Sequence, residues 1–245
     1  MNQNLRLITY NIRKGKGASG RKDGCVESIG QALAPLRPDV LLCQEVFHAD
    51  PAYAQDNRQQ SQALGQKLSM IPCYGPNRVR RRGEYGNATL SKLPVEYVQN
   101  HDVTTNMIEK RGVLYARLKM GNMPLHVFNA HLGLNQPQRL RQIRRIAAII
   151  SETCAPDEPV LLAGDFNDWT RRIDQEVVGR MGFSNAMADV TGPQSLTWHV
   201  RRPVFNLDRV YLRHLEVRNA ERLAGAPWNE LSDHFPLMAE LAYRP

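Results

Sequence analysis

The stretch Val160-Leu161-Leu162-Ala163-Gly164-Asp165-Phe166-Asn167-Asp168 decides the fold that we expect. It begins as a short apolar run, which is typical of a buried strand. It ends in Gly-Asp-Phe-Asn, so a carboxylate (Asp165) and a carboxamide (Asn167) lie at the strand's tip. The carboxylate can accept a proton from water, and the amide two positions later points to the same side and can hold that water. Because Gly, Asp and Asn are also turn residues, a turn that caps the next helix is the competing interpretation.

The same pattern, an apolar strand followed by polar residues, recurs along the chain. Asp208 interrupts an otherwise strand-like run, where an acid is costly unless it is paired, and a histidine is the obvious partner. The recurring motifs are Thr9-Tyr10-Asn11-Ile12, Gln44-Glu45, Gly86-Asn87-Ala88, Asn129-Ala130-His131-Leu132, Gly164-Asp165-Phe166-Asn167 and Ser232-Asp233-His234-Phe235-Pro236.

Length and composition indicate one globular domain over residues 1–245. The 245 residues contain no linker rich in Gly, Ser or Pro, no low-complexity tract and no internal repeat. The formal net charge of +8 suits a polyanionic partner, namely nucleic acid, an anionic membrane surface or a phosphorylated metabolite. Many soluble proteins are simply basic, so the charge gives this reading only a modest preference and says nothing about the fold or the reaction.

Cysteine spacing and the N-terminal residues argue against several classes of protein. No two of the four cysteines form a C-x-x-C pair, so a zinc knuckle or a redox motif is not indicated. The first residues run directly into a strand pattern, and the sequence has no leader-like segment and no long apolar segment. We therefore expect a monomeric cytoplasmic enzyme without a transmembrane segment.

Periodicity predicts strands and helices that alternate along the chain. We expect an antiparallel meander in the middle, because short turns such as Gly121-Asn122 separate its strands. A very basic loop is predicted at residues 79–82, and Gln44-Glu45 is expected at the end of a strand. Mixed sheets with helices outside fit this order, either as one sheet or as a sandwich with helical outer layers. The predicted strands are 5–12, 39–43, 87–91, 95–103, 113–120, 125–130, 159–163, 205–212, 215–217 and 235–241; the predicted helices are 26–36, 53–70, 138–150 and 173–181.

Taken together, these motifs resemble the endonuclease/exonuclease/phosphatase superfamily of DNase I-like, metal-dependent phosphohydrolases. The resemblance runs from Thr9 to Pro236, in the family's order; Asp208 and the terminal Ser-Asp-His-Phe-Pro are its most specific parts. It implies an α+β fold: a four-layer sandwich of two mixed, largely antiparallel sheets packed face to face, with helices on the outside.

The resemblance also implies a divalent metal site. Glu45 matches the family's main metal ligand, and Asn11 matches the amide beside the metal and the scissile phosphate. Asp233 matches a carboxylate close to the metal. One carboxylate with several waters is how Mg²⁺ is usually held, and Mn²⁺ is a substitute. Without the other motifs, the preferred interpretation of Glu45 would be a surface acid at a strand end.

The catalytic residues that the resemblance implies are acids, an amide and imidazoles. Asp165 matches the residue that orients or deprotonates the attacking water, and Asn167 matches its positioning partner. His234 matches the histidine that faces the phosphate, and Asp208 matches the carboxylate that fixes its ring. His131 matches a second active-site histidine that contacts phosphate or protonates the leaving oxygen. A structural Asp–His pair and a structural His131 are the alternatives.

The substrate side of the site is less defined by the sequence. Asn87 matches an amide that lines the pocket. Arg13 stands where abasic-site nucleases usually have an acid, which weakens that reading, and it could instead grip a substrate phosphate. Trp198 stands near further arginines and suits a nucleic-acid backbone or a phospholipid headgroup. The arginines of the 138–150 helix are read as a solvated face.

The sequence therefore predicts a Mg²⁺-dependent phosphohydrolase that cleaves a phosphodiester by metal-assisted in-line attack of water. A nuclease acting on nucleic acid is the first hypothesis. A phospholipid or phosphoinositide phosphodiesterase or phosphatase is the alternative. A catalytically inactive adaptor that binds nucleic acid or anionic membrane is the second alternative.

Overall fold

The computed structural model describes residues 4–20, 25–50, 59–190 and 195–243. These residues form two six-stranded mixed sheets. The first sheet has the strand order β11-β12-β1-β2-β4-β3 and the second has the order β5-β6-β7-β8-β10-β9. The strands of the first sheet are β1 (Asn4–Asn11), β2 (Val40–Ala49), β3 (Ile71–Arg80), β4 (Gly83–Ser91), β11 (Leu215–Arg222) and β12 (Leu237–Tyr243). Those of the second are β5 (Val95–Asp102), β6 (Gly112–Met120), β7 (Met123–His131), β8 (Val160–Asp165), β9 (Ser184–Asn185) and β10 (Asp208–Arg213).

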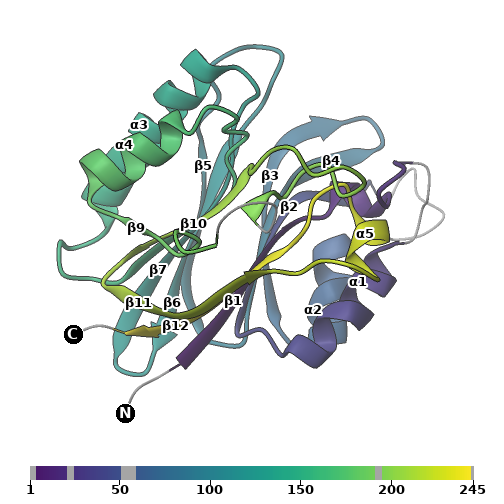
Figure 1. The fold of residues 1–245 in the computed structure, drawn as a ribbon, viewed down its shortest axis with the longest axis horizontal. Helices are drawn as coiled ribbons and strands as arrows, with labels where there is room; N and C mark the ends of the chain where they lie inside the picture. Colours follow the sequence, from purple (N-terminus) through teal and green to yellow (C-terminus); the bar gives the residue numbers. More distant parts are fainter. Residues whose placement is uncertain (1–3, 21–24, 51–58, 191–194, 244–245) are drawn as a thin grey trace.

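Helices cover the outer face of each sheet, so the predicted four-layer sandwich is confirmed (Figure 1). Figure 1 shows α3 and α4 on one side of the paired sheets, and α1, α2 and α5 on the other. The α-helices are α1 (Cys25–Leu33), α2 (Gln60–Leu68), α3 (Gln136–Thr153), α4 (Arg172–Met181) and α5 (Trp228–Leu231), and short 3₁₀ helices span Arg13–Gly15 and Ala34–Leu36.

Three apolar layers hold these elements together. One lies between the first sheet and its helices, one between the two sheets, and one between the second sheet and α3 and α4. Central strands are buried on both faces: in β8, Leu161 and Ala163 point between the sheets, while Val160 and Leu162 point toward the helices. This is why the segment reads as a continuous apolar run instead of an alternating one.

Several element predictions need correction. The predicted basic loop at 79–82 is the end of a hairpin, because β3 extends to Arg80 and pairs with β4. Strand β3 escaped prediction because Pro72 and Pro76 interrupt its pattern; proline is tolerated there because β3 is an edge strand. Strand β10 begins at Asp208, and Phe205 pairs with Trp198 in an isolated bridge.

The predicted second helix is also shorter than expected. Of the predicted range 53–70, residues 53–58 lie outside the described residues, and α2 covers Gln60–Leu68. Strand β2 does not end at Glu45: it continues through a bulge to Ala49. The antiparallel meander β5-β6-β7 is confirmed by its pairing.

His48 couples this fold to pH. The residue is 7% exposed, and its ring stacks on Tyr74 and bonds Ser61 Oγ at 2.8 Å. Burial lowers the pKa of His48 to about 4. The unfolded chain takes up that proton near pH 6.5, so the stabilisation is complete above that pH and is lost as the pH falls toward 4. We expect His48→Gln to remove about 2 kcal/mol of the acid dependence of the unfolding free energy.

Urea unfolding at pH 7 and pH 4.5 measures this dependence. His214→Asn is the matched control, because His214 is exposed and has a φ of 56°, which asparagine tolerates. An acid dependence that is equal in wild type and His48→Gln would reject the assignment.

Candidate active site

Four strands place polar side chains between the two sheets, near one end of the inter-sheet layer. Asn11, His131, Asp165 and Asp208 each continue the alternation whose apolar members fill that layer. The register aligns three of them, since His131 on β7 and Asp208 on β10 both lie opposite Asp165 on β8. The layer thus changes from apolar to polar at these strand ends.

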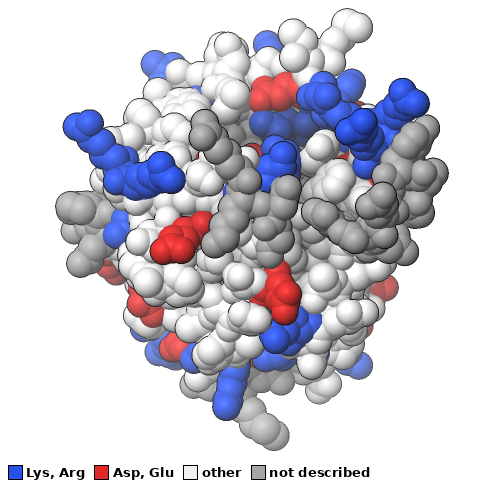
Figure 2. Space-filling view, turned by 90° about the vertical axis from the view of Figure 1, so that its right-hand side faces the viewer, with Lys and Arg blue, Asp and Glu red and all other residues white. Residues whose placement is uncertain are grey.

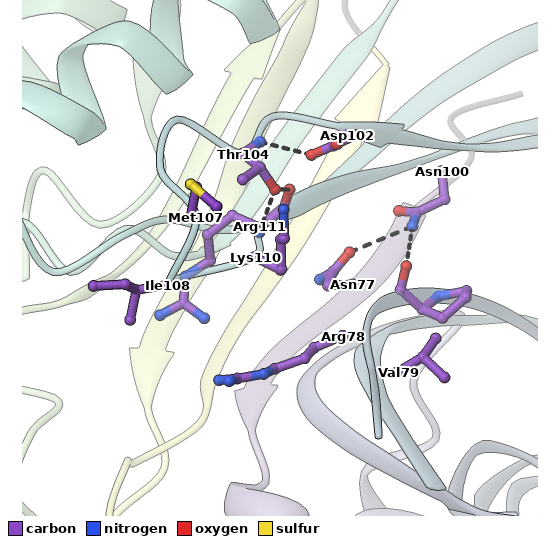
Figure 3. A pocket seen from close by; sticks show the side chains of 11 residues that line it. Asn77, Arg78, Val79, Asn100, Asp102, Thr104, Met107, Ile108, Lys110 and Arg111 are labelled. Carbon is purple, nitrogen blue, oxygen red and sulfur yellow. Dashed lines mark hydrogen bonds between the residues drawn. The ribbon is translucent and has the colours of Figure 1, made fainter. Parts of the chain in front are cut away.

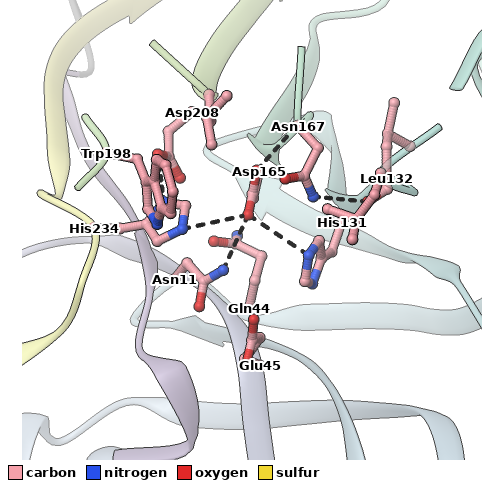
Figure 4. A network of polar contacts seen from close by, with 12 residues as sticks. Asn11, Gln44, Glu45, His131, Leu132, Asp165, Asn167, Trp198, Asp208 and His234 are labelled. Carbon is pink, nitrogen blue, oxygen red and sulfur yellow. Dashed lines mark hydrogen bonds and ion pairs between the residues drawn. The ribbon is translucent and has the colours of Figure 1, made fainter. Parts of the chain in front are cut away.

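Asp165 is the centre of the resulting network (Figure 4). Asn11 Nδ2, from the other sheet, donates to Asp165 Oδ2 at 3.0 Å. His131 Nε2 and His234 Nε2 lie 3.5 Å and 3.7 Å from the same oxygen. The backbone N–H of Asn167 donates to Asp165 Oδ1 at 2.9 Å. One carboxylate therefore collects nitrogen atoms from three segments that are distant in sequence and one from its own turn.

Asn167 is fixed by the turn that follows β8. Its φ is 48°, in the left-handed region that asparagine tolerates. Its side-chain Nδ2 donates to Leu132 O at 2.9 Å, which ties the turn after β8 to the end of β7. The first turn of α4 is instead bonded by Asp168, whose Oδ2 accepts from the backbone N–H of Ile173 at 2.9 Å. Asp168 therefore serves the next helix, and Asp165 faces the inter-sheet site.

His234 is held by the predicted partner. Its Nδ1 lies 2.9 Å from Asp208 Oδ2, and both side chains are buried. Burial alone would lower the pKa of His234, but the carboxylates of Asp208 and Asp165 outweigh burial and raise it to about 10. His131 differs, because burial and Arg111 lower its pKa to about 4. At neutral pH the site therefore holds one charged and one neutral imidazole.

For the phosphodiester hydrolysis that the family resemblance implies, Asp208→Asn is expected to lower kcat by about 10²-fold or more, with little change in KM. The asparagine removes the charge that keeps His234 protonated and oriented. Steady-state kinetics of the purified variant measure this loss, and Asp189→Asn is the control, since Asp189 is exposed. A wild-type kcat in Asp208→Asn protein would leave the pair a purely structural role.

Glu45 reaches the site because β2 is irregular there. The β2–β4 register shifts between Cys43 and Val46, and Glu45 has a φ of 53°, so the bulge redirects its side chain. Glu45 Oε2 lies 2.7 Å from Lys14 Nζ. Burial raises the pKa of Glu45, but His131, which is protonated in the acidic range where Glu45 titrates, and Lys14 outweigh burial and lower it to about 2.

Buried amides join the two sheets beneath the site. Gln44 Nε2 donates to Asn129 Oδ1 at 2.8 Å and to Thr9 Oγ1 at 3.2 Å. Asn129 Nδ2 in turn donates to Ala88 O at 2.9 Å. Asn87 Nδ2 donates to Gly112 O and Asn129 O, so the Asn87 amide braces the two sheets at the point where it lines a cleft.

Asp233 and the predicted residues Arg13 and Trp198 form a neighbouring group. Asp233 Oδ2 lies 3.4 Å from Arg13 Nε and accepts from Trp198 Nε1 at 3.4 Å. The Arg13 guanidinium also donates to Gly17 O and Ala18 O, which holds it against its own loop. Trp198 stacks on Phe205 with ring centroids 6.1 Å apart. The roles of these residues toward substrate and metal stay predictions.

A basic cleft of about 440 Å³ opens at Glu45 and His131. Figure 2, a view from the right-hand side of Figure 1, shows Lys and Arg side chains gathered mainly in the upper part of that face. Such a cleft suits a phosphate-bearing ligand. Its charged lining residues are Lys14, Lys16, Glu45, Arg78, Arg80, Glu109, Lys110 and Arg111.

The sequence pattern of the Endonuclease/Exonuclease/phosphatase family matches residues 8–234, a span that contains every network residue described above. The chain belongs to this family. It is also 33% identical to the protein YbhP of Escherichia coli K12, over 97% of this chain and 96% of YbhP. Members of the endonuclease/exonuclease/phosphatase family are generally hydrolytic phosphoesterases that depend on a divalent metal.

Solved structures of the family share this fold. A family protein from Bacteroides vulgatus superposes with a TM-score of 0.81 and 19% identity, covering 99% of this chain and all of that one. A humanized TDP2 from D. rerio gives 0.75 and 20% identity, with 97% and 98% coverage. Among the described residues, no helix is long and apolar enough to cross a membrane.

The residues at Glu45 fit the divalent metal that the family generally uses. The carboxylate is ionised, lies on a cleft and already has a cation, the Lys14 ammonium, beside it. Oxygen donors of this kind suit Mg²⁺ and Mn²⁺. A second group, Asp165, Asp208 and His234, offers ligand atoms within 4.8 Å of one another, but His234 Nδ1 is already bonded to Asp208.

Two features of the site were not predicted. Lys14 was not singled out, and its ion pair with Glu45 depends on the tertiary approach of two segments. Trp169 was not singled out, although it packs against Phe205 at 5.3 Å beside Trp198. An aromatic residue directly after the Gly-Asp-Phe-Asn-Asp turn was the signal in the sequence that pointed to Trp169.

Proposed function

We propose that this chain is a divalent-metal-dependent phosphodiesterase that hydrolyses its substrate by in-line attack of water. The observation that carries the proposal is the environment of Asp165 Oδ2, which has nitrogen atoms of Asn11, His131 and His234 within 3.0–3.7 Å. A carboxylate in this position can orient a water and accept its proton, while the surrounding nitrogens face the phosphoryl oxygens.

Each residue has a separate task in this proposal. Asp165 and Asn167 position the attacking water and take its proton. Protonated His234, oriented by Asp208, donates to a phosphoryl oxygen as negative charge develops, and His131 contacts the phosphate. A metal held by Glu45, with Asn11 and Asp233 as the further ligands that we predict, would polarise the phosphate and stabilise the leaving oxygen.

Two substrate classes fit the basic cleft. Nucleic acid is the first, since a cleft lined by lysines and arginines neutralises a phosphate backbone. A phospholipid headgroup is the second, and a specific observation favours it. Two exposed apolar side chains, Met107 and Ile108, lie in the loop next to the cleft residues Lys110 and Arg111.

Metal removal tests the chemistry. We expect EDTA to abolish hydrolysis of bis(p-nitrophenyl) phosphate and Mg²⁺ or Mn²⁺ to restore it, because no other group described here polarises the phosphate as strongly. Glu45→Gln should raise the Mg²⁺ concentration needed for half-maximal activity by about tenfold or more. Full activity in EDTA would overturn metal dependence. Tight nucleic-acid or vesicle binding without turnover under any divalent metal would support the non-catalytic adaptor instead.

A substrate panel separates the two classes. Plasmid DNA, RNA and vesicles of phosphatidylglycerol are incubated in parallel with Mg²⁺ and wild-type protein. Asp165→Asn protein, prepared in the same way, controls for contaminating hydrolases. Hydrolysis confined to DNA or RNA supports the nuclease, and hydrolysis confined to vesicles supports the phospholipid phosphodiesterase.

A further inference from the structure

A second groove of about 540 Å³ adjoins the basic cleft. It lies between the end of the β3–β4 hairpin and the loop of residues 103–111 that joins β5 to β6. Asn77, Arg78, Lys110 and Arg111 line both the groove and the cleft, so the two are continuous. Figure 3 shows Val79 on one side of this groove, Met107 and Ile108 on the other, and Arg78 extending between them.

The loop ends around this groove expose aliphatic side chains to water. Met107 is 92% exposed, Ile108 is 82% exposed and Val79 is 74% exposed. Exposed apolar residues scattered singly need no explanation, but apolar residues grouped around a functional groove mark an interaction surface. Val79, Met107 and Ile108 come from two separate segments and line one groove, so they form a group and mark an interaction surface.

Hydrogen bonds hold the 103–111 loop in the shape that presents these side chains. Asn106 Oδ1 accepts from the backbone N–H groups of Ile108 and Glu109, at 2.8 Å and 2.6 Å. Arg111 N donates to Thr104 Oγ1 at 3.1 Å, which closes the base of the loop. Glu109 Oε2 also accepts from the backbone N–H of Leu134 at 3.3 Å. The loop therefore keeps Met107 and Ile108 outward without a hydrophobic partner of its own.

We propose that the residues Val79, Met107 and Ile108, with Arg78 and Lys110, form a docking rim that seats the protein on an anionic lipid bilayer. Transfer of aliphatic side chains from water into the acyl layer lowers the free energy of the bound state. The long arginine and lysine side chains bring their charged ends to the anionic headgroups. Single-stranded nucleic acid is instead held by flat aromatic side chains that stack on bases, and the rim has none. Docking would bring headgroup phosphates to the mouth of the cleft.

This inference rests on the phospholipid form of the proposed function and deepens it. The headgroup phosphate would enter past Arg78, Lys110 and Arg111, which line both openings, and reach Glu45 and His131. The rim thus defines a substrate class, a phosphodiester presented at a membrane surface. Binding to the bilayer is measurable without catalysis, so the two proposals can fail separately.

Cosedimentation with vesicles in EDTA tests the docking rim. We expect wild-type protein to pellet with phosphatidylglycerol vesicles and to stay in solution with phosphatidylcholine vesicles. Met107→Ser/Ile108→Ser should weaken the partition into vesicles by about tenfold at every salt concentration, since it removes apolar area that the bilayer would bury. Arg78→Glu/Lys110→Glu should weaken it mainly at low salt, because screening removes the electrostatic attraction at high salt.

Matched variants control for general effects of each substitution. Val178→Ser changes an exposed aliphatic side chain on α4, and Lys92→Glu reverses a charge at the other end of β4 from the hairpin. Both should bind vesicles like the wild type, and thermal unfolding confirms that every variant is folded. Equal vesicle binding by wild type and Met107→Ser/Ile108→Ser would overturn the rim.

A nucleic-acid role of the same surface is a separate outcome. Wild-type protein that ignores phosphatidylglycerol but binds a DNA duplex, with the rim variants losing that binding, would also overturn the proposal. Turnover of bis(p-nitrophenyl) phosphate with no vesicle binding would reject the rim and leave the phosphodiesterase standing. Vesicle binding without turnover under any divalent metal would keep the docking rim and reject the phosphodiesterase.

Discussion

Asp165→Asn protein is expected to hydrolyse a phosphodiester about 10³-fold more slowly than the wild type, with the loss in kcat and not in KM. The carboxylate oxygen Oδ2 is the point at which Asn11, His131 and His234 meet. An amide at this position keeps the size of the side chain but cannot accept the proton of the attacking water. The loss therefore falls on the chemical step.

The experiment compares kcat and KM for bis(p-nitrophenyl) phosphate at saturating Mg²⁺. Asp157→Asn is the matched control, because Asp157 is exposed and precedes the N-terminal end of β8, whereas Asp165 is its last residue. Thermal unfolding of both variants separates lost chemistry from lost structure. Wild-type kcat in Asp165→Asn protein, combined with strict metal dependence, would show that another group activates the water.

Gly164→Ala is expected to lower the free energy of unfolding by about 3–5 kcal/mol. Gly164 has a φ of 139°, a conformation that L side chains rarely adopt. A Cβ built there would lie 2.0 Å from Ala130 O and 3.1 Å from Ala130 N. Both atoms are backbone of the paired strand β7, so relief requires strands β7 and β8 to separate at the site.

Urea unfolding monitored by circular dichroism measures this loss. Gly179→Ala is the matched control, since nothing lies within 4 Å of a Cβ at Gly179 in helix α4. That control should be neutral or gain up to about 1 kcal/mol from helix propensity. A Gly164→Ala protein as stable as the wild type would mean that β8 accommodates the methyl group by a local shift, and that the close approach is not needed for stability.

Strong periodicity accounts for the elements that were predicted well. Helix α3 carries a clear apolar stripe, and β8 is a continuous apolar run. Strands β1 and β6 combine apolar residues with partial alternation. Edge strand β3 has no such pattern, because its Ile71 and Val79 are exposed and two prolines interrupt it. A strand that buries little leaves little trace in the pattern of apolar residues.

The site was predicted as residue types and not as an arrangement. Asp208 and His234 were paired from the cost of an acid within a strand and from the family resemblance, and they lie 2.9 Å apart. Glu45 was expected at a strand end, whereas a bulge inside β2 turns it into the cleft. Backbone conformation of that kind is set by how β2 pairs with β4, which no local pattern records.

The sequence by itself determined which residues are polar at strand ends and, in the regular strands, which face each of them takes, because side chains alternate along a regular strand. Glu45, which lies at the β2 bulge, is the exception. Only the tertiary structure decided that two separate sheets pack so that Asn11 of one reaches Asp165 of the other at 3.0 Å. The parallel pairing of β1 with β2 brought Lys14 to Glu45. The packing of the two sheets set Met107 and Ile108 across a groove from Val79. The physical reason is that alternation is a local property of the backbone, while the meeting of distant strands depends on the register and burial of the whole inter-sheet layer.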